Sequence, residues 1–144
     1  MDKKELAVDC FKRGYSCSQA VFSTFSQELG MEPEMALKTA GAFGGGMARM
    51  GETCGAVTGA FMALGLKHGK AHEGDDAARE KTYGLVHEFV TRFQASHGSI
   101  RCNTLLDCDM STPEGRKQAR DQKKFDELCP RLVHDASEIL EEIL

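Results

Sequence analysis

The segment from Cys54 to about Lys67 constrains the fold most, because it is apolar on nearly every side. A helix without a polar face must be covered all round, so we expect it at the centre of a helical bundle. Its small residues Gly55, Gly59 and Ala63 would let neighbouring backbones approach closely. Glycine costs about 1 kcal/mol relative to alanine inside a helix, so two glycines here require a packing reason of this kind.

Helical periodicity also extends over most of the remaining chain. Apolar residues recur at helical spacing within residues 3–13, 16–29, 75–96 and 130–143, and shorter helical segments are predicted at 33–42, 102–106 and 113–124. No segment shows the sustained alternation of a half-buried strand. No linker or low-complexity tract divides the chain. We therefore predict one all-α domain over residues 1–144, a bundle of five to seven helices around the central apolar helix.

The charge balance and the apolar stretches exclude two classes of partner. The chain has 18 basic and 22 acidic residues and a net charge of −4, without a basic stripe interleaved with aromatic residues, so we expect no nucleic-acid binding. The most apolar stretch, residues 55–66, is too short to span a bilayer, and the amino terminus lacks the pattern of a secretory signal. We expect a cytoplasmic protein without membrane insertion.

Six cysteines are the main candidates for chemistry. In a reducing compartment they are expected to bind metal or take part in catalysis rather than form structural disulfides. Four of them, Cys17, Cys54, Cys102 and Cys129, fall at predicted helix starts. The free N–H groups and the partial positive charge of a helix start favour thiolate, so we expect the pKa of these thiols to be lowered.

The spacing of these four cysteines indicates which kind of site they can form. They are separated by 37, 48 and 27 residues, and the chain has no C-x-x-C pair, which disfavours a thioredoxin-type site and a zinc ribbon. Any common site must therefore be assembled by the fold, and we expect the four to converge. Four thiolates are the ligand set of an iron–sulfur cluster or of a structural zinc ion.

Other residues near these motifs receive secondary roles. Cys10 is expected to fill the core, whereas Cys108, in a polar turn, is expected to be a surface thiol. Arg49 is a candidate for offsetting the negative charge of several thiolates. The glycine spacing of residues 46–51 is that of a phosphate-binding loop, but Glu52 stands where such a loop needs lysine, so we reject a nucleotide site.

The segments around the four cysteines resemble a family of redox-active proteins named for its cysteine pattern, C_GCAxxG_C_C. Cys17-Ser-Gln-Ala-Val21 is similar to its first signature, Gly45-Gly46 to the following glycine element, and Cys54-Gly-Ala-Val-Thr-Gly59 to its central CGAxxG motif. Cys102 and Cys129 stand where the last two cysteines are expected. The resemblance implies an association with oxidoreductase or transport functions. A similar domain in split-Soret cytochromes implies an iron–sulfur site, although this chain lacks the C-x-x-C-H haem motif.

Three functions use the same four cysteines. The first is an iron–sulfur electron-transfer or sensing domain, with Cys17, Cys54, Cys102 and Cys129 as ligands and with Gly45, Gly46 and Gly55 against the cofactor. The second is a cofactor-free thiol–disulfide oxidoreductase, and the third a zinc-binding interaction module. The glycine-rich, apolar setting of Cys54 favours the cluster. The expected partner is a redox protein or an oxidoreductase, and a homodimer is also allowed.

Overall fold

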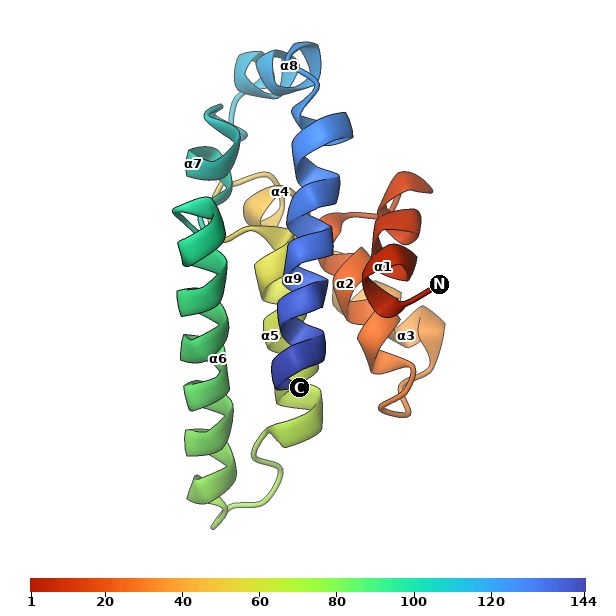
Figure 1. Ribbon diagram of the computed structural model, residues 1–144, viewed down its shortest axis with the longest axis vertical. Helices are drawn as coiled ribbons and strands as arrows, with labels where there is room; N and C mark the ends of the chain where they lie inside the picture. Colours follow the sequence, from red (N-terminus) through yellow and green to blue (C-terminus); the bar gives the residue numbers. More distant parts are fainter.

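The computed structural model describes residues 1–144, and its regular structure is entirely helical (Figure 1). In chain order the elements are α1 Lys3–Lys12, α2 Cys17–Ser26, α3 Pro33–Thr39, α4 Gly44–Met47, α5 Gly55–His68, α6 Asp76–His97, α7 Cys102–Leu106, α8 Pro113–Asp121, the π-helical turn η1 Lys124–Leu128, and α9 Cys129–Ile143. The glycines inside α4 are left-handed, so eight regular α-helices remain. The all-α prediction is confirmed.

The prediction of five to seven helices is too low, because each of the short segments expected to be helical, α3, α7 and α8, forms a helix of its own. The helix α8 is one example: Pro113 occupies its first turn, and the Thr112 hydroxyl accepts a hydrogen bond from the Gly115 N–H at 2.9 Å. A capping side chain of this kind satisfies N–H groups that a helix start leaves free. The helix α2 begins in the same way, with Ser16 and Gln19 forming a reciprocal capping box.

The apolar helix α5 packs between α2, α6 and α9 (Figure 1). A Cβ atom added to Gly59 would lie 2.8 Å from the Ser18 carbonyl oxygen, so the prediction of close backbone approach at this glycine is confirmed. The enclosed part of α5 is shorter than predicted. Leu64 is fully buried, but Leu66 is 38 % exposed.

Two clusters of buried residues make up the interior. The large cluster has 21 members and lies between α1, α2, α5, α6 and α9, where Phe61, Phe89 and Phe93 form edge-to-face and stacked aromatic pairs. The small cluster has six members, contributed by α7, α8, α9 and the turn after α7. Its members are Cys102, Leu106, Cys108, Met110, Ala119 and Cys129.

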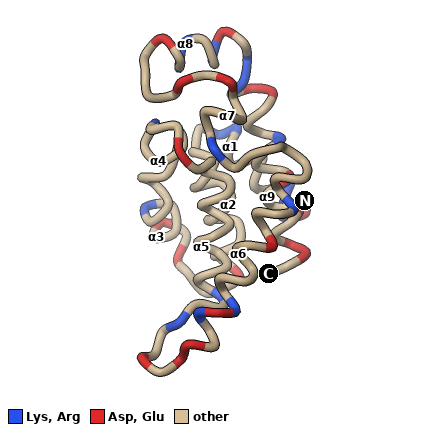
Figure 2. The backbone as a smooth tube through the Cα atoms, turned by 90° about the vertical axis from the view of Figure 1, so that its left-hand side faces the viewer, with Lys and Arg blue, Asp and Glu red and all other residues tan.

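The charged residues lie mainly outside these clusters. Figure 2 shows uncharged backbone through α2 and most of α5, whereas basic and acidic residues alternate along the outer helices and the loop before α6. Ion pairs join neighbouring helices, among them Lys4 to Glu138 at 3.2 Å and Arg92 to Glu142 at 2.7 Å. None of the helices combines the length and the apolar character needed to cross a membrane.

Candidate functional site

One small apolar cavity is lined by all four cysteines of the predicted site. Cys17 comes from α2, Cys54 directly precedes α5, Cys102 begins α7, and Cys129 begins α9. The cavity measures about 110 Å³, and ten of its fourteen lining residues are hydrophobic. Cysteines that are far apart in the sequence thus meet at one place, as the spacing argument requires.

The cavity lies at the junction of the two buried clusters. Cys54 is a member of the large cluster, whereas Cys102 and Cys129 belong to the small one. Cys17 is half-buried and packs against both clusters. A group bound by the four cysteines would therefore lie against both clusters, which Phe11, Cys17 and Leu128 also contact.

A left-handed turn brings the glycine element to this cavity. Five successive residues, from Gly45 to Arg49, have positive φ angles between 53° and 70°. Left-handed backbone costs roughly 1–2 kcal/mol for each residue that carries a Cβ, which here means Met47, Ala48 and Arg49. Strained backbone of this kind concentrates at functional sites, where the surrounding structure holds it in place.

Within the left-handed turn, the backbone at Gly46 passes too close to other segments to carry a side chain. A Cβ atom on Gly46 would lie 2.6 Å from the Cβ of Cys102 and 2.7 Å from the Glu52 nitrogen. A Cβ atom on Gly55 would lie 3.1 Å from the Cβ of Cys17. Gly45, Gly46 and Gly55 all line the cavity, so the glycines let the cysteine-bearing segments approach one another.

Backbone hydrogen bonds hold Cys54 and Cys102 next to each other. The Cys54 N–H donates to the Ile100 carbonyl at 2.7 Å, and the Cys102 N–H donates to the Glu52 carbonyl at 2.6 Å. Between them, Thr53 and Arg101 form an isolated antiparallel bridge. This short ladder is the only β-type pairing of the chain, and it fixes the separation of the two cysteines.

Cys129 is positioned by the π-helical turn η1. The sequence predicts a helix opened by Pro130, but the helical backbone already begins at Lys124, and the Cys129 N–H donates to the Lys124 carbonyl. Inside an α-helix the ring of Pro130 would clash with the carbonyl four residues earlier, and the wider π turn avoids this contact. Cys129 is thus the first residue of α9, in agreement with the predicted helix start, but its own N–H group is already bonded within the preceding turn.

Burial, rather than position at a helix start, determines the direction in which the pKa values of two of the thiols are shifted. Burial raises the pKa of Cys54 to about 11, although the N–H groups of Ala56 and Val57 at the start of α5 oppose the shift. Burial also raises the pKa of Cys102 to about 12, and the neighbouring Cys54 and Cys129 add to this. The predicted lowering of these pKa values is wrong, because removing the thiolate from water outweighs the helix-start N–H groups.

Cys17 and Cys129 lie close enough to affect each other's protonation. Interaction with Cys17 lowers the pKa of Cys129, whereas interaction with Cys129, together with burial, raises the pKa of Cys17 well above its ordinary value. Cys129 is therefore the cysteine in the cavity that ionises most readily.

The comparisons with known proteins agree with this geometry. Residues 15–143 match the family model described as "Putative redox-active protein (C_GCAxxG_C_C)". The chain belongs to the C_GCAxxG_C_C family. The match covers the four cysteines and the glycine element, so the resemblance inferred from the motifs is confirmed. Comparison with curated proteins and with solved structures gives no significant match.

The two cysteines outside the C_GCAxxG_C_C pattern both belong to the interior. Cys10 is 5 % exposed with its sulfur 3.9 Å from the Ser23 hydroxyl, which agrees with the predicted packing role. Cys108 is only 7 % exposed, so the prediction of a surface thiol is wrong. Charged neighbours in the sequence suggested exposure, but Asp107 and Asp109 point outward while Cys108 packs against the small cluster.

Arg49 does not line the cysteine cavity; it lines an adjacent hollow, which shares Gly45 with that cavity. Sequence reasoning also missed Met110 and Phe125, which line the cavity. Each is an apolar residue within a polar stretch of the sequence, and this pattern could have indicated that they pack against the site. No three His, Cys, Asp or Glu side chains are grouped as they would be around a single metal ion.

Proposed function

We propose that this member of the C_GCAxxG_C_C family binds an iron–sulfur cluster through Cys17, Cys54, Cys102 and Cys129, and that it exchanges electrons with a redox protein partner. The observation that carries the proposal is the convergence of these four cysteines on one apolar cavity. Four cysteine sulfurs are the usual ligand set of such a cluster, and an apolar, shielded setting is the environment in which its potential is tuned.

The spacing of the cysteines favours a cluster over zinc. Structural zinc sites usually take their ligands from short paired motifs such as C-x-x-C, and this chain has none. A cluster is bound through several iron atoms, so its ligands can come from four separate segments around a cavity, as these four cysteines do.

The surrounding residues have defined tasks in this proposal. Gly46 and Gly55 let the backbone pass close to Cys102 and Cys17. The N–H groups of Ala56 and Val57 at the start of α5 lower the pKa of Cys54 and would stabilise its negative charge when it acts as a ligand. Cys17 is the one half-buried cysteine of the four, so its side of the cavity is the shortest route for electrons to a partner.

The bound cluster would supply one-electron transfer, and the protein must first release thiol protons to hold it. Because the pKa values of Cys54 and Cys102 are raised to about 11 and about 12, cluster assembly competes with protons. We therefore expect cluster affinity to increase as pH rises through the neutral range.

Anaerobic reconstitution with iron and sulfide tests the proposal. We expect broad visible absorption, together with iron and acid-labile sulfide bound to the chain. Replacing Cys54 or Cys102 with serine should lower the bound iron about tenfold or more. Cys10→Ser is the matched control, because Cys10 is equally buried but lies outside the cavity, and it should bind iron as the unmodified protein does.

The proposal is wrong if reconstituted protein stays colourless and binds no iron at pH 7 and pH 8.5. It is equally wrong if the Cys10→Ser and Cys54→Ser variants retain the same iron. Circular dichroism of each variant separates loss of the cofactor from loss of the fold, since the chain is mainly helical.

A second candidate function rests on the proximity of Cys17 and Cys129, which line the same cavity. The Cys129 thiolate, favoured by the neighbouring Cys17, would attack a disulfide of a partner and release one partner thiol. Cys17 would then attack the mixed disulfide, so that a Cys17–Cys129 disulfide and a second partner thiol result. Protein that binds no iron but forms this disulfide reversibly would favour this function.

A further inference from the structure

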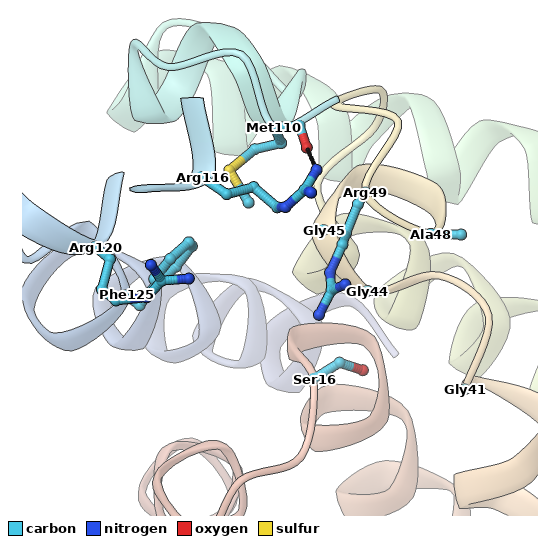
Figure 3. Close-up of a pocket in the computed structure, with 10 residues that line it drawn as sticks. All are labelled: Ser16, Gly41, Gly44, Gly45, Ala48, Arg49, Met110, Arg116, Arg120 and Phe125. Carbon is cyan, nitrogen blue, oxygen red and sulfur yellow. Dashed lines mark hydrogen bonds between the residues drawn. The ribbon is translucent and has the colours of Figure 1, made fainter. Parts of the chain in front are cut away.

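A second hollow lies beside the cysteine cavity, and its charged lining is entirely basic. It measures about 610 Å³, a volume within the range of small-molecule sites. Arg49, Arg116 and Arg120 line it, whereas no aspartate or glutamate does (Figure 3). Three arginines around one hollow are conspicuous in a chain with a net charge of −4.

The three arginines have no acidic partners. None of them takes part in an ion pair, although many other basic residues of the chain do, such as Lys117 and Arg92. The Arg116 Nη1 donates to the Met110 carbonyl at 2.9 Å, which orients this guanidinium within the hollow (Figure 3). Like charges at close quarters repel, so an anion between them would be stabilised by all three.

Arg49 reaches the hollow from the strained left-handed turn. Its φ angle is +66°, and its side chain passes Gly45, where an added Cβ would lie 3.0 Å from the Arg49 Cγ. In Figure 3, Arg49 extends toward Ser16, while Arg116 and Arg120 come from α8. The left-handed turn that brings Gly46 close to Cys102 thus also places the positive charge of Arg49 in the neighbouring hollow.

The hollow and the cysteine cavity share part of their walls. Ser16, Gly45, Met110 and Phe125 line both. A molecule in the hollow would therefore lie directly against residues that cover the cysteines. This proximity connects the basic hollow with the chemistry of the cysteine site.

We propose that this hollow binds the phosphate or carboxylate group of a small anionic molecule through Arg49, Arg116 and Arg120, next to the cysteine cavity. Guanidinium groups bind both oxyanions through paired, charge-assisted hydrogen bonds. The site goes beyond the cluster proposal and does not depend on it, because the arginines are in place without any cofactor. It gives a role to three arginines that form no ion pair and that do not take part in the cysteine site.

Titration of the full-length, isotope-labelled protein with inorganic phosphate, and separately with succinate, tests the site by nuclear magnetic resonance at constant ionic strength. We expect saturable shifts at the Gly44 and Gly45 amides and none at Gly84, which lies on the distant part of α6. Saturation by phosphate alone, by succinate alone or by both supports the site and identifies the anion class. Shifts that rise linearly, or that chloride reproduces, would overturn the proposal.

Arginine variants provide the decisive comparison. Arg49→Gln and Arg120→Gln should each weaken anion binding about tenfold, as expected for losing one charge-assisted contact. Arg120 is exposed and its side chain makes no hydrogen bond or ion pair within the protein, so we expect its replacement to leave the fold intact. Arg79→Gln, at the far end of α6, should change binding by less than about twofold. Equal binding by the Arg49, Arg120 and Arg79 variants would refute the site, whatever the outcome of iron reconstitution.

Discussion

The large and the small buried clusters differ in the side chains that fill them. The large cluster is filled by aromatic and aliphatic side chains, and Phe89 and Phe93 are fully buried within it. The small cluster has six members, of which three are cysteines. Packing of large apolar side chains stabilises a fold directly, whereas a small cluster beside a cavity gains fewer contacts. The comparison indicates that the large cluster maintains the fold and that the small cluster gains most from a ligand of the cysteines.

The largest expected effect follows from removing an aromatic side chain from the large cluster. Phe93→Ala should lower the free energy of unfolding by about 3–5 kcal/mol, because Phe93 stacks on Phe89 with ring centroids 5.9 Å apart. Urea denaturation followed by circular dichroism measures this loss.

Met110→Ala in the small cluster should instead lower the local stability of α7 and α8 alone. Hydrogen exchange should accelerate in α7 and α8 while the amides of α6 keep their protection. If Met110→Ala accelerated exchange equally in α6, the two clusters would form one cooperative unit, and the comparison would fail.

The next effect concerns the glycine between the clusters. Gly46→Ala should lower the free energy of unfolding by about 3 kcal/mol, since it combines a left-handed backbone with contacts to Cys102 and Glu52. Iron binding should be lost with it. Gly84→Ala is the control: an added Cβ meets no atom within 4 Å, so it should stabilise α6 by up to about 1 kcal/mol. Equal stability of the two variants would show that the left-handed turn is not required.

The dependence of stability on pH tests the buried thiols. Without cofactor, Cys54 keeps its proton in the folded chain up to about pH 11, whereas in the unfolded chain it ionises near its ordinary pKa of 9.0. Stability should therefore be complete below pH 9 and fall between pH 9 and about 11, by on the order of 2 kcal/mol.

Cys54→Ala removes this contribution, so its stability should fall less steeply over that interval than that of the unmodified protein. Urea denaturation at several pH values measures both slopes. Parallel slopes would mean that Cys54 is not held in its neutral form by burial.

The smallest effect is expected at Cys108. Cys108→Ser places a more polar group among the apolar side chains of the small cluster and should cost about 1 kcal/mol of stability. Iron binding should persist, because Cys108 does not line the cavity. Thermal unfolding and the iron content of the reconstituted variant measure the two quantities, and loss of iron would place Cys108 among the ligands.

The helical class, the apolar character of α5 and the four cysteines could be predicted from the sequence, because these depend on local periodicity and on motifs of a few residues. The apolar character of α5 requires burial wherever the helix lies, and the CGAxxG motif is contiguous. The match to residues 15–143 rests on the same information.

Only the tertiary structure decided the protonation preferences of the thiols, the burial of Cys108 and the place of Arg49. Each depends on how much water is excluded by segments that are distant in the chain, and sequence neighbours do not report this. Cys54 stands before a helix, as predicted, yet burial raises its pKa to about 11. The local sequence indicates which helix a residue lies on, but the free energy of ionising its side chain depends on all the segments that pack around it.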